Sequence, residues 1–485
     1  MSFWDKVEPD VKRSLRASER DGFFWAVMAG FGENFVQPFA IFLRATNLQI
    51  AALASVPQLV SALLLPHIGG LTDRLRMRKR IVLTAVVLQA WMWLPILVLP
   101  ALMGARAVPL LVLLYTIYLI LARFSAPAWI SWMGDLVPES VRGEYFGHRN
   151  LIIQLTTVCS TLVAGSLLGL FEERSELLGF GLLFVVAFLA RMASAGFLRQ
   201  VQEPAYVHQQ QDDFTLRQFV GRLPSTTYGR FVIFNCLLRL ATAFSAPFFA
   251  LYMLHDLGLG YGSYTLVIAS STFAKVFTMQ QWGRIGDRFG NRRVLGVTAL
   301  LIPVVPMLWL LSTKVWWLVL IELFAGLAWG GYDLAGANFL FDAVRPAKRV
   351  RVFAFHETLH GICLFLGAMA GGLVSTRVPQ LSFAVSPLQT IFLLSGLLRL
   401  LAVGMLLHTV KEVRVIAGQQ RLPLPLVIAE PMEDILYGAF HGMRHGAKLV
   451  TERGVHGMRR GFYSVDRIYH QAAEDMRRSF RGKKA

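Results

Sequence analysis

The chain has 485 residues, of which 55% are hydrophobic and only 16% are charged, and its mean hydropathy is +0.51. This composition excludes an ordinary soluble enzyme and a disordered chain, because the apolar residues occur in runs of about 20, the length that crosses the hydrocarbon core of a bilayer. The net charge of +18 would suggest nucleic-acid binding in a soluble domain. In a membrane protein, basic cytoplasmic loops explain the same excess.

The apolar runs predict an all-α membrane protein with twelve spanning helices, six on each side of a polar stretch. The first twenty residues are polar and contain no apolar signal-peptide region, so the first span is expected to direct its own insertion. The spans are expected near residues 22–43, 48–68, 81–103, 109–133, 150–171, 179–198, 230–254, 262–282, 294–312, 315–340, 352–374 and 387–408.

Both ends of the chain are expected in the cytoplasm, at a bacterial inner membrane. Most of the 48 Lys and Arg residues fall on the side of the two termini, and the opposite loops contain only Arg44, Arg106, Arg174, Lys314 and Arg377. The predicted parts are an N-terminal segment (1–21), a first bundle (22–198), a central loop (199–229), a second bundle (230–408) and a basic amphipathic tail (409–485). The tail either lies on anionic lipid headgroups or docks a partner protein.

Two loops, one in each half, carry the same motif. The loop after the second span reads GGLTDRLRMRKR from Gly69, and the loop after the eighth reads GRIGDRFGNRR from Gly283. In both, Gly precedes Asp by four residues and Arg follows Asp directly. Two further pairs match at a similar separation of about 210 residues: Pro38 with Pro247, and Arg191 with Arg399. These coincidences indicate a duplicated six-helix unit.

The motif and the number of spans resemble the major facilitator superfamily of secondary transporters, over roughly residues 20–410. That family's loop signature is G-x-x-x-D-R-x-G-x-R-R, and the run DLVPESVRGEYFG from Asp135 resembles its loop between helices four and five. One position departs, because Arg76 stands where the first copy should have its second Gly, while Gly290 keeps it in the second copy. The resemblance implies two pseudo-symmetric bundles, with spans one, four, seven and ten around a central cavity.

The motif residues are candidates for a cytoplasmic gate. An Asp at a short turn accepts hydrogen bonds from a helix N-terminus, and the Arg residues that follow can bind carboxylates or lipid phosphates. The resemblance implies a polar latch that holds the halves together in one state and releases them in the other; the alternative is that the basic residues only set the topology. The gating candidates are Gly69, Asp73, Arg74, Arg78, Gly283, Asp287, Arg288 and Gly290.

Polar and ionisable residues inside the spans are the candidates for a substrate and proton site. A charged side chain at the bilayer centre costs about 2.5 to 3.5 kcal/mol on insertion scales, so each one needs a partner, a water-filled cavity or a function. The candidates are Glu33, Asn34, Gln37, Arg123, Arg239, Lys275, Glu322 and Asp333.

Two chemical roles are expected within this set. Glu33 and Asp333 are candidate proton carriers, and the alternative for Glu33 is a structural ion pair with Arg123 or Lys275. Arg123, Arg239 and Lys275 are candidate contacts for an anionic solute, because such cations bind carboxylate and phosphate groups. Mutual pairing with the carboxylates of the set is the competing interpretation.

Other charged residues of the spans are expected to be structural. Arg191 and Arg399 should reach carbonyl groups or lipid headgroups by snorkelling. The run HETLH, from His356 to His360, matches the zinc-protease pattern H-E-x-x-H. An intramembrane metalloprotease would need a third ligand, for which the sequence offers no convincing motif. Proton handling by this His/Glu cluster is the other functional interpretation, and a structural role is favoured.

The sequence therefore predicts a secondary transporter that works by alternating access, is coupled to protons and moves a small organic solute, with an anionic solute favoured. Export of amphipathic drugs or lipid-like compounds is the alternative, and an intramembrane zinc metalloprotease or a non-transporting sensor or scaffold is the alternative from another class. No phosphate-binding loop of the ATPase type occurs, so ATP-driven transport is not expected. We expect no enzyme activity, no cofactor, no metal and no nucleic acid, and partners limited to solute, protons and the lipid bilayer around a monomer.

Overall fold

The computed structural model describes residues 7–75, 77–103, 107–204, 214–345, 348–382 and 384–413, and every regular element in these ranges is helical. The chain divides into two compact units, Met1–Arg421 and Leu422–Ala485, and the described residues all belong to the first. From residue 414 onwards, the predicted tail lies outside the described residues.

Both halves of the first unit consist of long helices. The first half contains α1 (Pro9–Phe31), α2 (Val36–Phe42), α3 (Asn47–Leu75), α4 (Arg78–Trp91), α5 (Trp93–Met103), α6 (Ala107–Leu136), α7 (Arg142–Phe171) and α8 (Glu176–Leu198). The second half contains α10 (Thr227–Ala243), α11 (Phe248–Leu251), α12 (Tyr261–Phe289), α13 (Asn291–Leu301), α14 (Val304–Leu308), α15 (Val315–Ala343), α16 (Arg349–Ser375) and α17 (Leu388–Leu406). Between them lies the short helix α9 (Leu216–Arg222).

Each of the twelve predicted spans overlaps one or more of these helices. Within the described ranges, ten helical segments are long and apolar enough to cross a membrane. The first and eighth predicted spans, which correspond to α1–α2 and α12, are not among these ten. Polar and charged residues within α1 and α12 dilute their apolar character. The chain is therefore an all-α, multi-pass membrane protein.

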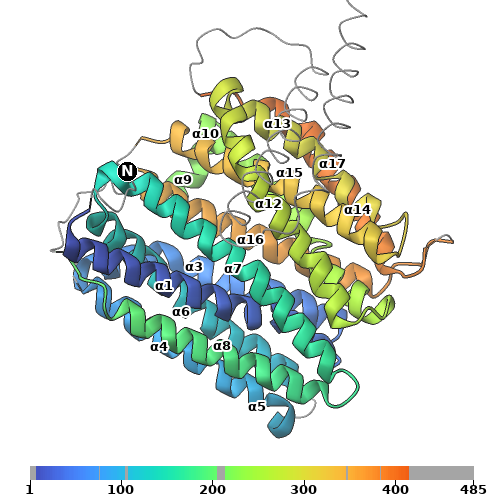
Figure 1. Ribbon diagram of the computed structural model, residues 1–485. Coiled ribbons are helices and arrows are strands. Elements are labelled where there is room, and N and C mark those ends of the chain that lie inside the picture. The colour runs from blue at the N-terminus through green and yellow to red at the C-terminus, as the bar shows by residue number, and fades with distance from the viewer. Residues whose placement is uncertain are drawn as a thin grey trace, which may run out of the picture. The chain divides into compact units, whose positions relative to one another are not determined.

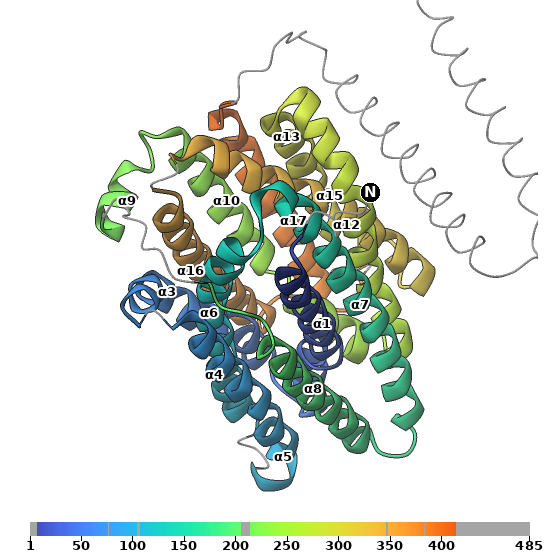
Figure 2. The same cartoon turned by 60° about the vertical axis from the view of Figure 1, so that its left-hand side comes forward.

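The two halves repeat the same pattern of helix neighbours. In the first half α1 packs on α7 and α8, and α6 packs on α3 and α4; in the second half α10 packs on α16 and α17, and α15 packs on α12 and α13. Figures 1 and 2 show α1 to α8 gathered together and α10 to α17 gathered together. The duplicated loop motif thus belongs to a duplicated bundle.

Four spans are broken into shorter helices at equivalent places in the two halves. The first span is interrupted by a 3-10 turn at Glu33–Phe35, and the seventh breaks before Pro247, which directly precedes α11. The third span breaks between α4 and α5, and the ninth breaks before Pro303, which directly precedes α14. Proline lacks an N–H donor and interrupts helix hydrogen bonding, which accounts for the two breaks in the second half.

The halves meet along two helix pairs, α3 with α16 and α7 with α12. Small residues allow this close approach. A Cβ atom added to Gly165 would lie 2.1 Å from Thr265 Oγ1, and one added to Gly361 would lie 2.6 Å from the Cβ of Ala62. Helices pack closely in membranes where small residues face one another, so these glycines are required by the interface.

Hydrogen bonds between the halves lie in the middle of the helices and at one end. At that end Tyr261 donates to Glu176 over 3.2 Å, and Asn47 donates to Ser375 over 3.1 Å. At the opposite end, where α4 and α13 begin, the described bonds of Arg78 and Arg292 stay within their own halves. The two bundles are therefore bound together at the end that carries the connection from α2 to α3.

Candidate functional site

Three charged residues from three helices meet in the second half. The guanidinium group of Arg239 (α10) donates to one carboxylate oxygen of Asp333 (α15), and the Lys275 ammonium group (α12) donates to the other over 2.6 Å. Their side chains remain 24%, 27% and 35% exposed, in the order Arg239, Asp333, Lys275. Because one carboxylate faces two cations, this triad carries one excess positive charge.

Aromatic rings surround the Arg239 side chain. Its guanidinium carbon lies 4.5 Å from the centre of the Trp329 ring and 5.7 Å from that of Tyr332. The Tyr332 hydroxyl donates to Asn235, whose amide group lies 2.9 Å from Nε2 of His356. The rings fix the orientation of the guanidinium group through cation–π contact and packing.

A separate polar contact joins the two halves. Arg123 (α6) lies 3.4 Å from the Glu357 carboxylate (α16) and donates to Gln58 (α3) over 3.3 Å. Nδ1 of His360 lies 4.0 Å from the same carboxylate. Arg123 is thus placed at the contact between the bundles, whereas Arg239 and Lys275 lie together within the second bundle.

Glu33 lies in the first half, at the break between α1 and α2. The hydroxyl group of Tyr118 (α6) donates to its carboxylate over 2.5 Å, and the Tyr118 ring packs on Trp93 and Tyr115. The alternative prediction, an ion pair of Glu33 with Arg123 or Lys275, is wrong, because Arg123 pairs with Glu357 and Lys275 pairs with Asp333.

The other predicted polar residues make separate contacts. Asn34 donates to the Thr161 hydroxyl over 2.7 Å, and the Gln37 side chain donates to the carbonyl group of Pro247 in the other half. Glu322 lies about three helical turns before Asp333 on α15, which places it outside the triad. The predicted site residues therefore form two groups, one in each bundle, with Gln37 and Arg123 at the contact between them.

Arg191 and Arg399 do not snorkel, contrary to the prediction. Their exposed fractions are 5% and 2%, and both are buried inside their own bundles. Arg191 donates to Gln89 over 2.8 Å, and Arg399 donates to Ser245 over 3.1 Å. A buried guanidinium group requires hydrogen-bond acceptors, and polar residues of neighbouring helices supply them here.

The first loop motif is described only in part. Gly69, Asp73 and Arg74 lie in the last turns of α3, where the described structure is limited to the backbone, and Arg76 lies outside the described residues. Arg78 is fully buried at the start of α4 and donates to Asp135 over 2.5 Å and to the Pro204 carbonyl group over 3.0 Å. These contacts lie within the first half, so in this conformation Arg78 binds α4 to α6 and to the segment after α8.

The second motif has an equivalent arrangement. Gly283, Asp287 and Arg288 lie on α12, and the Arg288 guanidinium group lies 4.9 Å from the centre of the Phe289 ring. Gly290 has φ of +94°, a conformation that favours glycine. After the turn, Arg292 donates to the Val410 carbonyl group over 2.7 Å, so the start of α13 holds the segment after α17.

The HETLH segment does not assemble a metal site in the part of the chain that the structure describes. There, His356 and His360 are joined by no third His, Cys, Asp or Glu in a group able to hold a metal ion. The two rings stack with centres 6.3 Å apart, and His356 is bonded to Asn235. The segment therefore belongs to the polar network of α10, α15 and α16.

Some residues of the site were not predicted from the sequence. Tyr118, Trp329 and Tyr332 are aromatic residues in apolar helices, and their composition alone does not distinguish them from core residues. The charge of Glu357 within a span is a signal for a site residue, but nothing in the sequence identifies Arg123 as its partner.

Comparison with solved structures shows the fold. A mutant of the nucleoside transporter NupG has a TM-score of 0.65 at 13% identity, covering 82% of this chain and 100% of that one. A bacterial homologue of the iron transporter ferroportin, in an inward-facing state, has a TM-score of 0.62 at 16% identity, covering 83% of this chain and 99% of that one.

Two relatives are similar in sequence over parts of their length. The class H tetracycline resistance protein of Pasteurella multocida is 28% identical over 126 residues, 25% of this chain and 31% of that protein. The multi-drug resistance efflux pump PmrA of Streptococcus pneumoniae is 26% identical over 248 residues, 49% of this chain and 59% of the pump. The matched regions thus span less than two thirds of either relative.

The family assignment rests on most of the chain. Residues 22–228 and 231–444 each match the description of the Major Facilitator Superfamily. The two matched segments each cover most of one bundle, and the second continues to residue 444. The protein is therefore a membrane transporter rather than an enzyme, and the chain belongs to the Major Facilitator Superfamily.

Proposed function

We propose that this protein is a proton-coupled secondary transporter of a small organic anion, working as a monomer by alternating access in a bacterial inner membrane. The observation that carries the proposal is the triad of Arg239, Lys275 and Asp333. Two cations share one carboxylate, and all three side chains are partly exposed. A carboxylate or phosphate group on the solute would neutralise the excess charge and bind bidentately to the guanidinium group.

The contacts between the bundles support alternating access. The bundles are bound together at the end where Tyr261 contacts Glu176. The positive-inside rule assigns the opposite end, with its basic loops, to the cytoplasm. In this orientation the conformation is closed toward the outside, and transport requires that the contacts at Gln37 and at Arg123 break and re-form.

Glu33 is the proposed proton carrier. It accepts a hydrogen bond from Tyr118 and makes no ion pair with a described cation, so protonation removes a buried charge without leaving a cation unpaired. Asp333 is the second candidate, since a solute anion could replace it as the partner of Lys275.

Export of amphipathic drugs is the second candidate function. It is supported by the names of the two relatives, a tetracycline resistance protein and a multi-drug resistance efflux pump. Aromatic rings near Arg239 would also suit a flat, apolar compound.

The two functions are distinguished by thermal-shift measurements on purified protein. One panel contains dicarboxylates and sugar phosphates, and the other contains ethidium, tetraphenylphosphonium and tetracycline. We expect stabilisation by a member of the first panel that is lost in Lys275→Met and kept in Lys314→Met, a matched change at an exposed cation before α15.

Transport is then measured in proteoliposomes that contain a pH-sensitive dye. Addition of the stabilising anion should move protons in wild-type protein and not in Glu33→Gln. Stabilisation by the second panel alone, unaffected by Lys275→Met, would refute the anion assignment and support drug export.

A further inference from the structure

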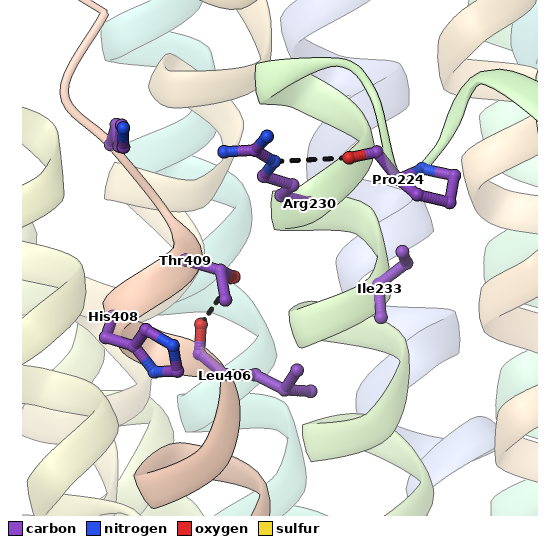
Figure 3. Close-up of a pocket in the computed structure, with 7 residues that line it drawn as sticks. Pro224, Arg230, Ile233, Leu406, His408 and Thr409 are labelled. Atoms are coloured by element: carbon purple, nitrogen blue, oxygen red, sulfur yellow. Dashed lines mark hydrogen bonds between the residues drawn. The ribbon is translucent and has the colours of Figure 1, made fainter.

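A cavity of about 370 Å³ lies between the connection that enters α10 and the chain at the end of α17 (Figure 3). It is separate from the charged residues of the proposed transport site. Its lining combines apolar and basic side chains and contains no carboxylate: Pro224, Arg230, Ile233, Leu406, His408, Thr409 and Lys411.

The basic groups of the cavity have free hydrogen-bonding capacity. Arg230 uses its Nε to donate to the Pro224 carbonyl group over 3.2 Å, and Figure 3 shows its guanidinium group extending from α10 toward the chain after α17. Neither of its two terminal nitrogens bonds to a described residue, and the exposed Lys411 forms no ion pair or hydrogen bond within the described ranges. At least two cations are thus available to one anion.

The walls of the cavity are held in place without a ligand. Arg292 donates from its backbone N–H to Glu412 over 2.9 Å and from its side chain to the Val410 carbonyl group over 2.7 Å. The hydroxyl group of Thr409 donates to the Leu406 carbonyl group over 2.7 Å. The segment that carries His408 and Lys411 is therefore fixed, and binding would require little ordering of the chain.

The cavity lies where two apolar helical segments end. The candidate spans Thr227–Asp256 and Leu388–Thr409 both have an end at this cavity. The ends of spanning helices lie at the level of the lipid headgroups, and basic pockets there attract anionic headgroups. Ile233 and Leu406 line the cavity on the side of the spans, where an acyl chain would begin.

We propose that this cavity is a binding site for one anionic phospholipid. Arg230 and Lys411 contact the phosphate and headgroup, and Ile233 and Leu406 contact the first carbons of an acyl chain. A free phosphate ion would use only the basic groups and would leave the apolar wall uncovered. Bound in this way, the lipid joins the segment that enters α10 to the segment that leaves α17.

The test is a titration of the full-length protein in detergent, followed by native mass spectrometry. The probes are dioleoyl phosphatidylglycerol, dioleoyl phosphatidylcholine and inorganic phosphate. We expect phosphatidylglycerol to bind more tightly than phosphatidylcholine. Each removed cation should weaken phosphatidylglycerol binding by about five-fold, so Arg230→Gln with Lys411→Gln should weaken it by about twenty-five-fold.

The matched control is Arg217→Gln with Arg345→Gln, which removes two exposed cations outside the cavity and leaves the tail unchanged. Equal loss of phosphatidylglycerol binding in the two double variants would overturn the proposal, because the effect would then be one of net charge. Full displacement of phosphatidylglycerol by millimolar inorganic phosphate would also overturn it and would identify a phosphate site. A further variant, Leu406→Gln, keeps every cation. It should weaken the binding of phosphatidylglycerol and leave any binding of inorganic phosphate unchanged.

Discussion

The triad predicts an unequal response to the removal of its members. Lys275→Met leaves Arg239 paired with Asp333, whereas Asp333→Asn leaves two neighbouring cations without a carboxylate. The loss of one partner of a fully buried ion pair costs about 3–5 kcal/mol. Because the Asp333 side chain is 27% exposed, water screens part of this, and we expect Asp333→Asn to lower the free energy of unfolding by about 2–3 kcal/mol.

Lys275→Met should be much milder. It loses one charge-assisted hydrogen bond, worth about 1.5 kcal/mol, and it also removes a cation whose burial is unfavourable. The net change should be within about 1 kcal/mol. In the double variant, Lys275→Met with Asp333→Asn, only Arg239 of the triad remains charged, and it lies over the Trp329 ring. The double variant should therefore be more stable than Asp333→Asn alone.

The assay is unfolding of the purified protein by SDS in mixed micelles, followed by tryptophan fluorescence. The four proteins form a double-mutant cycle, from which we expect a coupling energy of about 1–2 kcal/mol. If Asp333→Asn is as stable as Lys275→Met, or if the double variant shows simple additivity, the excess positive charge inferred from the geometry is refuted.

Three further predictions concern other parts of the structure. Gly290→Ala places a Cβ at φ of +94° and should lower the free energy of unfolding by at least about 1 kcal/mol in the same SDS assay, while Gly296→Ala, at a helical glycine with open space, should not. Arg78→Lys cannot reproduce the bonds to Asp135 and Pro204 and should lower the midpoint of thermal unfolding; an unchanged midpoint would show that these bonds contribute nothing. Glu33→Gln keeps an acceptor for Tyr118 but no titratable group, so uptake into proteoliposomes should no longer respond to a pH gradient; a retained response would assign coupling to another residue.

The sequence predicts the fold because the features that indicate the fold can be recognised from residues close together in the chain. Twelve apolar runs, a repeated loop motif and the excess of basic residues on one side depend on neighbouring positions, and the observed helices and the Major Facilitator Superfamily match agree with them. The breaks within the spans are harder to predict from the sequence. A proline lies at the break before Pro303 and another, Pro38, follows the interruption at Glu33–Phe35, but Pro57 and Pro127 lie inside unbroken helices, so the presence of a proline alone does not predict a break.

The pairing of charges could not be predicted in the same way. Several carboxylates were available to Arg123, and its partner Glu357 is 234 residues away on a helix of the other half. Arg191 was expected to reach carbonyl groups or lipid headgroups by snorkelling, yet it donates to Gln89 inside its own bundle. Such choices depend on the rotation of each helix about its axis, which apolar composition leaves undetermined when a span is hydrophobic on all sides.

The seam of glycine and alanine along α3 and α16 affects how the two bundles can move. Gly361 against Ala62 and Gly372 against Ala51 bring the backbones together with almost no side chain between them. Helix surfaces with such small side chains can rotate against one another without requiring long side chains to change rotamer. Such a rotation also leaves few hydrogen-bond donors without an acceptor in the membrane. In the alternating-access cycle proposed above, this seam would act as the pivot, so that the cavity could close toward one side of the membrane and open toward the other with little steric resistance.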